Sequence, residues 1–428
     1  MGNKLSRSVS IIGVGYTPLG DVRSDEGIKD FTERELYAAA ALEAMDNAGI
    51  RSNAIDAFYV GMVAPNYWAK TLSTAPQFGE WVGMADKPTL FHDEGCATSM
   101  IGFQQAVQAV ASGQFDCVLS GGATIVQSEP KQYLYPPFQR EAYDPYDWWW
   151  KVQTGNDICY EKIGGEIAAS IDANNVMYCQ QNHVAFDDLH DAMITYLQVE
   201  RKAALRNPRA VTVTETYEEE AARFGFSSVR DYLLNDQFDP RGGTFGRALY
   251  SGKFVDGASA IIVCETELAK KICKRAPVEV AGVASASTTA RRGGTIPGSA
   301  YTKIFKNLYD MADITDPFNE VQYFSAHDCP CTQIFLVGEY AGYFPKGEGW
   351  KYMLEGRTAY DQDRPCQTSG GRTQLGHPVA GAIGVEITEA VNQIRGESTS
   401  QMPTPPKCAV IDGGGQGINL GACCLRAL

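Results

Sequence analysis

Strand and helix patterns alternate along the first third of the chain. Short apolar runs indicate strands, and a helix-spaced apolar face that stops at Gly49 indicates an amphipathic helix. One further segment is apolar on nearly every side, which is typical of a helix buried in a large domain. The predicted elements are strand 8–15, helix 33–48, strand 55–63, the all-apolar helix 97–112 and strand 115–120, which Gly121-Gly122 is expected to end.

A similar succession starts again after Pro277. A strand over 256–264 first returns the chain to the core, and a glycine-rich turn precedes the last predicted helix. The later elements are strand 278–284, helix 301–311, strand 321–324, helix 379–394 and strands 408–411 and 417–425. Strands that alternate with helices indicate a layered α/β fold. The two similar halves predict a duplicated unit.

A stretch of different composition lies between the halves. Residues 126–160 are rich in aromatic residues and proline and follow neither a helical nor a strand period. Residues 165–207 predict helix, and residues 213–250 are first acidic and then glycine-rich. We expect three units: a first half over 1–125 completed by 251–276, a cap and loop domain over 126–250, and a second half over 277–428.

Composition narrows the class of protein. The chain has 428 residues, of which 44% are hydrophobic, so it is large enough for two core units. Its formal net charge of −14 argues against nucleic acid as a partner. No apolar run approaches membrane-spanning length, and no secretory signal opens the chain, so we expect a cytoplasmic protein without a membrane partner.

The cysteines indicate reduced thiols rather than a disulfide framework. Twelve are scattered along the chain without a Cys-x-x-Cys pair, which is typical of a reducing compartment. Cys329 and Cys331 beside His327 resemble half a metal site. No second ligand pair stands at zinc spacing, so we predict no metal centre.

Cys96 is the candidate nucleophile. It follows Gly95 in a sharp turn and stands at the start of the all-apolar helix. Unpaired backbone N–H groups and the helix dipole favour a thiolate at such a position. The alternative is a buried structural thiol, which is the ordinary role of a free cysteine.

Three residues of the second half complete a candidate site. His377 opens a helix after a glycine-rich turn, and His327 ends a strand two residues before Cys329. A thiol nucleophile needs a base and donors for an oxyanion, and an imidazole can serve as either. A second thiol can move a proton to or from carbon. We predict an active site for acyl transfer through a thioester, placed where the two helix starts converge.

The chain resembles the thiolase superfamily over essentially its whole length. The resemblance rests on the Gly-Cys-Ala-Thr-Ser turn at Cys96, the Gly-His-Pro motif at His377 and the glycine cluster that starts at Gly413. It implies two βαβαβαββ halves in five layers with an inserted cap domain. His327-Asp328-Cys329 resembles the sterol-carrier-protein type, and Ile411 stands where most thiolases have their acid/base cysteine.

The resemblance also implies roles for these residues. Cys96 is expected to carry the acyl group, His377 to activate it, and Cys329 to act as acid and base on carbon. His327 and His377 are expected to line one oxyanion hole, and the backbone N–H groups of Cys96 and Gly413 the other. Pro330 departs from the phenylalanine usual in that type.

Substrates and partners are also implied. Coenzyme A is expected as co-substrate, without a permanently bound cofactor, and a homodimer with a small zinc-ribbon and OB-fold partner subunit. A resemblance to 2-benzoylsuccinyl-CoA thiolases implies cleavage to benzoyl-CoA and succinyl-CoA in toluene degradation. The phenyl group of the substrate is expected to contact Trp148 and Trp149 in the aromatic stretch. The free carboxylate of the substrate is expected to bind Arg372 on the glycine-rich turn, or alternatively Arg291-Arg292.

Several alternatives stay open at this stage. The basic residues Arg201, Arg206 and Arg209 are candidates for the CoA phosphates, although a solvated helix face is the commoner reason for such a group. The alternative for the aromatic stretch 126–160 is that its aromatic side chains pack against one another to stabilise the loop, rather than line a substrate pocket. For the whole protein, the alternatives are a short-chain acetyl-CoA acyltransferase, a decarboxylating ketosynthase and a non-catalytic acyl or lipid carrier.

Overall fold

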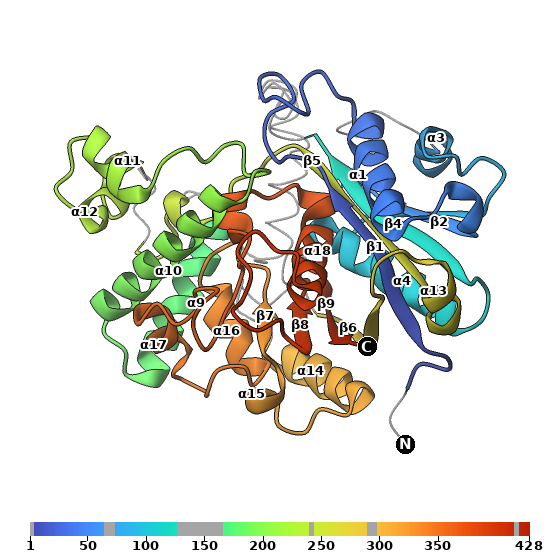
Figure 1. Ribbon diagram of the computed structural model, residues 1–428. Helices are drawn as coiled ribbons and strands as arrows, with labels where there is room; N and C mark the ends of the chain where they lie inside the picture. The colour runs from blue at the N-terminus through green and yellow to red at the C-terminus, as the bar shows by residue number, and fades with distance from the viewer. Residues whose placement is uncertain (1–3, 64–72, 126–165, 239–243, 289–297, 415–418) are drawn as a thin grey trace.

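A nine-stranded mixed sheet runs through the molecule (Figure 1). The computed structural model describes residues 4–63, 73–125, 166–238, 244–288, 298–414 and 419–428. The strand order is β3-β2-β4-β5-β1-β6-β9-β8-β7. The strands are β1 (Val9–Tyr16), β2 (Ala57–Gly61), β3 (Thr89–His92), β4 (Cys117–Thr124), β5 (Gly257–Glu265), β6 (Val278–Ser287), β7 (Tyr323–Ser325), β8 (Cys408–Asp412) and β9 (Asn419–Ala427).

The order of the strands shows the duplication. From the centre outwards, β1, β5, β4 and β2 on one side match β6, β9, β8 and β7 on the other. In both sets the first two pairings are antiparallel and the third is parallel. The sets join where β1 meets β6 over two residue pairs, and β3 adds one parallel strand to the first set. The predicted duplicated α/β fold is therefore confirmed.

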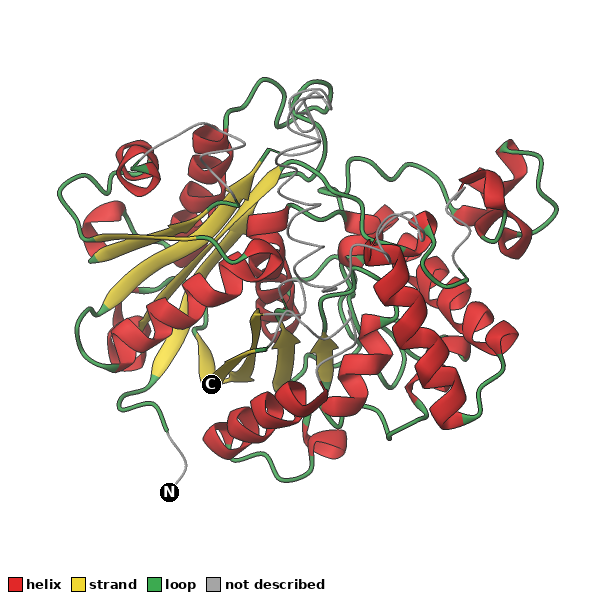
Figure 2. Ribbon diagram, turned by 180° about the vertical axis from the view of Figure 1, so that it is seen from behind, coloured by secondary structure: helices red, strands yellow, loops and turns green. Residues whose placement is uncertain are grey.

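Helices lie on the outer faces of the two sets of strands and also between the two sets (Figure 2). One apolar core lies between the first set of strands and an outer helix layer, and another between the second set and the opposite outer layer. A third core lies around two central helices between the sets, which gives five layers. The outer helices are α1 (Glu33–Ala48), α3 (Thr74–Trp81), α13 (Thr266–Ile272), α14 (Gly298–Ala312) and α16 (Gln333–Tyr340), and the central ones are α4 (Thr98–Ala111) and α18 (Ala382–Arg395).

The central position of α4 explains its composition. Met100, Phe103 and Val107 are fully buried in the third core, whereas Gln105 and Gln108 are exposed, so most but not all of this helix is covered. α18 is equally buried, yet it carries Glu386 and Glu389 in its interior. Buried carboxyl groups require compensation by hydrogen bonds or opposite charge. Two buried carboxyl groups on one helix are unusual, so Glu386 and Glu389 indicate a polar cluster in this part of the core.

Further helices pack against the second set and its outer helices. They are α9 (Glu166–Asn182), α10 (Phe186–Arg206), α11 (Tyr217–Arg223) and α12 (Val229–Leu233), with α15 (Pro317–Glu320) and α17 (Gly349–Leu354) from the second half. α10 packs against α17 and against the glycine-rich turn 371–375. The predicted helical stretch 165–207 is in fact two helices that break near His183, whose φ of 55° is left-handed. Trp148 and Trp149 lie outside the described residues.

The sequence interpretation of Gly121-Gly122 was wrong. Both glycines lie inside β4, which continues to Thr124. A Cβ atom on Gly122 would lie 2.5 Å from the carbonyl oxygen of Ala380, so the glycine permits that backbone to approach the strand. β3 was not predicted, and α18 starts after a short 3₁₀ turn rather than at Val379.

Two further expectations concern solvent and redox state. None of the helices in the described part of the chain is both long and apolar enough to cross a membrane. The cysteines within the described ranges are free thiols, and the buried sulfurs of Cys408 and Cys424 stand 3.6 Å apart without a bond.

Candidate active site

A short 3₁₀ turn presents Cys96 at the start of α4. The turn spans Gly95–Ala97, and Gly95 has a φ of 55°, which favours glycine. The Thr98 hydroxyl donates to the Gly95 carbonyl at 2.6 Å and accepts the Glu94 N–H at 2.9 Å. These bonds fix the turn that carries the thiol.

His377 is fixed by a short strand that pairs with it. Its N–H donates to the Lys253 carbonyl at 2.8 Å, and its carbonyl accepts the Val255 N–H at 3.3 Å. Gly376 precedes it with a φ of 120°, and a Cβ there would lie 2.7 Å from Val255. The imidazole packs against Phe254, with ring centroids 5.4 Å apart.

Hydrogen bonds between the halves bring the two helix starts together. The Ser99 hydroxyl on α4 accepts the Gly384 N–H on α18 at 3.0 Å. This bond caps α18 from another helix, because the residue before α18 supplies no side-chain cap. Nearby, the Ala380 N–H donates to Thr124 at 2.9 Å. The predicted convergence of the two helix starts is therefore present.

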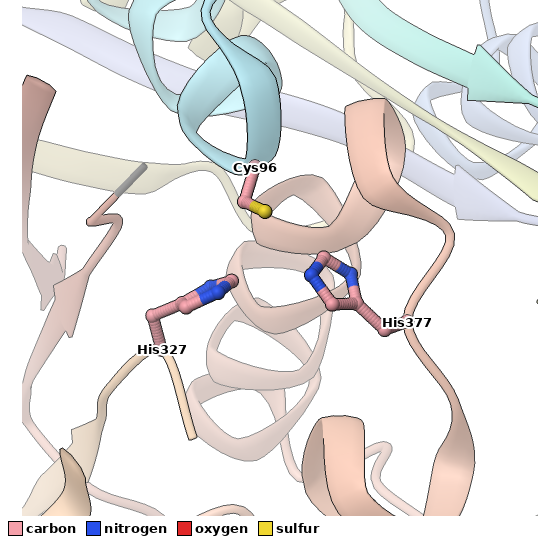
Figure 3. A group of neighbouring side chains, drawn as sticks. All are labelled: Cys96, His327 and His377. Atoms are coloured by element: carbon pink, nitrogen blue, oxygen red, sulfur yellow. The ribbon is translucent and has the colours of Figure 1, made fainter. Parts of the chain in front are cut away.

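Cys96, His327 and His377 meet at this junction (Figure 3). The Cys96 sulfur and one ring nitrogen of each histidine all lie within 4.8 Å of one another. The two imidazole rings have centroids 5.1 Å apart and stand nearly perpendicular, at 74°. His327 follows β7, and its N–H donates to the Asp412 carboxyl at 3.3 Å.

Cys329 is the second thiol of the site. Its charged form would raise the pKa of Cys96. A Cβ on Gly252 would lie 3.1 Å from the Cys329 sulfur, so glycine leaves space for the thiol there. Cys331 is fully buried, and its N–H donates to the Tyr250 carbonyl at 3.0 Å.

The expectation that the helix start favours a resting thiolate was wrong. Burial raises the pKa of Cys96 to about 12, and the neighbouring Cys329 adds to the shift. Arg372 and the backbone N–H of Cys96 lower this pKa, but they do not offset the loss of hydration. Burial likewise raises the pKa of Cys329 to about 11. Both groups rest as thiols, so Cys96 needs a base.

Both histidines can supply that base. Burial lowers the pKa of His377 well below 6.5, and the positive charge of Arg372 lowers it further. The pKa of His327 is lowered by burial, by Arg372 and by His377. Both imidazoles are therefore neutral near pH 7. Neither ring nitrogen of His377 has a hydrogen-bond partner among the described residues, so both can act on a substrate or thiol.

The same three side chains could in principle bind a metal ion. One sulfur and two imidazole nitrogens are donors of the kind that zinc accepts. A bound ion would occupy the lone pairs that the nucleophile and its base require. We therefore assign these atoms to acid–base chemistry.

Gly413 does not match its expected role. Its N–H donates to the Gly421 carbonyl at 2.7 Å, so it is not available to an oxyanion in this structure. This N–H is engaged because Gly413 continues the antiparallel pairing of β8 with β9. Ring nitrogens of His327 and His377 remain as oxyanion donors, each having at least one unpartnered nitrogen among the described residues.

Arg372 also differs from the expectation that it binds a substrate carboxylate. Its side chain is 1% exposed, and it pairs with Asp328 at 3.0 Å and with Glu386 at 3.6 Å. The same nitrogen donates to the Ala326 carbonyl at 2.8 Å. A substrate carboxylate would add a further negative charge to this pocket, which would repel it.

The three arginines expected at the CoA phosphates are not equivalent. Arg201 is buried and pairs with Glu220 at 3.0 Å, and Arg209 donates to Glu43 at 2.8 Å, so both charges are already compensated. Arg206 is exposed, stacks over the Tyr360 ring at 4.6 Å and pairs with no carboxylate among the described residues. It lines a cavity of about 350 Å³. Of the three, Arg206 remains a candidate.

Sequence reasoning missed four residues of the site. Glu200, Glu386 and Asp412 are buried carboxyls around the catalytic side chains, and Ser99 joins the helices. Burial raises the pKa of Asp412 from 3.8 to about 7. A carboxyl inside an otherwise apolar helix was the available signal for Glu386.

Comparisons with known proteins identify the family of the chain. Residues 9–134 match the thiolase N-terminal domain family, and residues 276–424 match the family described as thiolase C-terminal domain-like. The chain is 26% identical over 398 residues to an acetyl-CoA acetyltransferase of Methanothermobacter thermautotrophicus, covering 92% of each chain. It is 26% identical over 420 residues to benzoylsuccinyl-CoA thiolase subunit BbsB of Thauera aromatica, covering 96% of each chain.

A solved structure gives the same fold. The Ltp2–ChsH2(DUF35) aldolase superposes with a TM-score of 0.70 at 18% identity, covering 98% of each chain. The two matched families lie on the two halves of the sheet, in the order in which Cys96 and His377 occur. The chain therefore belongs to the thiolase superfamily of acyltransferases.

Proposed function

We propose that this acyltransferase is a coenzyme A-dependent thiolase. It cleaves or forms a β-ketoacyl-CoA through an acyl group bound to Cys96. The observation that carries the proposal is the meeting of the Cys96 sulfur with ring nitrogens of two neutral histidines within 4.8 Å. Cys329 follows His327 by two residues. A carrier protein needs none of these groups, and a decarboxylating ketosynthase has no use for Cys329 as a base.

The first half of the reaction attaches the acyl group. His377 takes the thiol proton of Cys96, and the sulfur attacks the β-keto carbonyl. The bond between the α and β carbons then breaks, and its electron pair passes to the α carbon as an enolate. Cys329 gives its proton to that carbon, which releases the shorter acyl-CoA.

The second half removes the acyl group. The Cys329 thiolate takes the proton of the CoA thiol, and the CoA sulfur attacks the thioester carbonyl. Cys96 leaves as a thiolate and recovers its proton from His377. Donors from His327 and His377 stabilise the oxyanions that form at the carbonyl groups.

We further propose 2-benzoylsuccinyl-CoA as the substrate, cleaved with CoA to benzoyl-CoA and succinyl-CoA. The relative named benzoylsuccinyl-CoA thiolase subunit supports this choice, because it matches the chain over almost its whole length. The aromatic residues of 126–160, including Trp148 and Trp149, would suit a phenyl group. An acetyl substrate is the competing choice, supported by the relative named acetyl-CoA acetyltransferase.

A partner subunit belongs to the same proposal. We expect a homodimer of this chain in the cytoplasm, joined by a small subunit with a zinc ribbon and an OB fold. The relative from Thauera is named as a subunit, and the aldolase of similar fold is named together with a DUF35 component. Fully active protein purified from its native source as a single polypeptide would contradict the partner.

Acyl transfer to the protein tests the function directly. After incubation with benzoyl-CoA or acetyl-CoA, a peptide that contains Cys96 should gain one acyl mass, and Cys96→Ser should gain none. Added CoA should remove the label as acyl-CoA. Label found only on another cysteine would overturn the mechanism, and binding without transfer would indicate a carrier.

The same assay decides the substrate. A benzoyl pocket predicts faster labelling by benzoyl-CoA than by acetyl-CoA. Preference for acetyl by tenfold, about 1.4 kcal/mol in activation free energy, would assign the chain to short-chain thiolases. Thiolysis of 2-benzoylsuccinyl-CoA, followed as formation of benzoyl-CoA, completes the test.

A further inference from the structure

A buried ion pair adjoins the segment that carries His327 and Cys329. The side chains of Arg372 and Asp328 are 1% and 0% exposed, and a guanidinium nitrogen donates to the Asp328 carboxylate at 3.0 Å. The backbone N–H of Arg372 reaches both oxygens of the same carboxylate, at 3.0 and 3.1 Å. The Asp328 carboxylate therefore accepts hydrogen bonds from both the main chain and the side chain of Arg372.

This ion pair fixes the segment that carries two catalytic side chains. Asp328 stands between His327 and Cys329, so its position sets the position of both neighbours. Arg372 lies in the π-turn Gly371–Leu375, which leads directly to His377. The pair thus ties three of the four expected catalytic residues to one buried contact.

Other carboxyl groups lie close to Arg372. Glu200 reaches the pair from α10, and a Cβ on Gly371 would overlap both Glu200 and Asp328. Burial, followed by the Asp328 charge, raises the pKa of Glu200 well above 4.5. Burial also raises the pKa of Glu386 to about 7.

The charge of Arg372 reaches every reacting group. It lowers the pKa of Cys96, Cys329, His327 and His377, and it also lowers that of Asp412. Two of its nitrogens, Nε and Nη2, have no partner among the described residues. A guanidinium used only for structure would be expected to have its donors satisfied.

We propose that Arg372 is a positioning residue of the acyl-transfer site: its ion pair with Asp328 fixes the His327–Cys329 segment, and its permanent charge stands behind both thiols and both imidazoles. The inference rests on the proposed thiolase function. It replaces the substrate-binding role that the sequence suggested for this arginine.

The test removes the pair without leaving one charge buried. Arg372→Met alone would leave the Asp328 charge buried without its partner, which is strongly destabilising. The double variant Arg372→Met with Asp328→Asn avoids that state. Arg372→Lys keeps the charge but loses the guanidinium fork. The matched control is Arg247→Met with Asp236→Asn, a pair 2.9 Å apart in which the arginine is also buried.

The first readout does not depend on turnover. Alkylation of Cys96 by iodoacetamide proceeds through the thiolate, and loss of the nearby cation lowers the thiolate fraction at fixed pH. We expect the double variant to react more slowly by about threefold, the change that half a pKa unit produces. The control pair should react at the wild-type rate, as measured by mass spectrometry of the Cys96 peptide.

The second readout is the pH profile of kcat/KM for thiolysis. Without Arg372 the pKa values of His327 and His377 rise, so the acid limb should move to higher pH in the double variant. Arg372→Lys should keep the acid limb but lower kcat, because the fork no longer holds Asp328.

The outcomes separate this inference from the proposed function. Wild-type alkylation rate and an unchanged acid limb in a folded double variant would overturn the role of Arg372. Wild-type kcat in Arg372→Lys would overturn the positioning part, and unfolding of both variants would leave the pair a structural role only. A different result is slower alkylation of the double variant together with no thiolysis by the wild-type protein. That result would support the role of Arg372 and overturn the thiolase function.

Discussion

At the scale of single residues, the two thiols of the candidate site differ in exposure from a third cysteine nearby. Cys96 and Cys329 are partly exposed, whereas Cys331 is fully buried, two positions beyond Cys329. Burial raises the pKa of all three, so exposure and position, rather than acidity, distinguish the reacting thiols.

Replacement of Cys329 should separate the two half-reactions. Cys329→Ala should still accept an acyl group from acyl-CoA onto Cys96, since His377 activates that sulfur. It should fail to make or break the carbon–carbon bond, because no group then moves the proton at carbon. Labelling and thiolysis assays measure the two steps. Cys331→Ala is the matched control, and loss of thiolysis in that variant alone would assign the acid/base role to Cys331.

At the scale of elements, the site exists because two central helices start side by side. α4 presents Cys96 and α18 follows His377, and each helix comes from a different half of the duplicated fold. The Ser99 hydroxyl supplies the cap that α18 lacks. This contact joins the starts of the two helices, so under the proposed function it affects both stability and catalysis.

Ser99→Ala should weaken both properties. The buried Gly384 N–H would lose its acceptor, which costs about 1–3 kcal/mol in the free energy of unfolding. The acylation rate of Cys96 should fall as the helix starts separate. Urea unfolding and acyl labelling provide the two measurements. Ser112→Ala, which removes a hydroxyl at the opposite end of α4, should change neither, and a wild-type acylation rate in Ser99→Ala would reject the coupling.

At the scale of the whole molecule, buried carboxyls make stability depend on pH. Asp412 is fully buried, and burial raises its pKa in the folded state to about 7. The folded state therefore holds this proton over a range where the unfolded state has released it. The stability from this group is complete below the unfolded pKa of 3.8 and is lost as the pH rises through about 7.

Asp412→Asn should remove that loss, because the amide does not ionise. Relative to wild type, the variant should become more stable as the pH rises from about 4 to about 8. Over that pH range, the difference in unfolding free energy between the variant and wild type should change by roughly 4 kcal/mol, because each of about three pKa units contributes about 1.36 kcal/mol. Urea unfolding at several pH values measures it. A difference in stability that stays constant with pH would show that Asp412 has an ordinary pKa.

The sequence determined the succession of elements, the duplication and the identity of the reactive side chains. Periodicity and glycine positions are local signals, so the first strand (expected over 8–15 and observed over 9–16), helix 33–48 and the turn at Cys96 followed from neighbouring residues alone. The proximity of Cys96 to His377 was also inferable, because a repeated unit places equivalent helix starts together.

Only the tertiary structure decided the charge state and the partners of those side chains. Burial depends on segments far apart in the chain, and it makes Cys96 a thiol where its helix position alone suggested a thiolate. Arg372 and Gly413 appeared available in the sequence, but Asp328 and Gly421 engage them in the fold. Desolvation and hydrogen-bond pairing are properties of a three-dimensional environment, and no local sequence pattern records them.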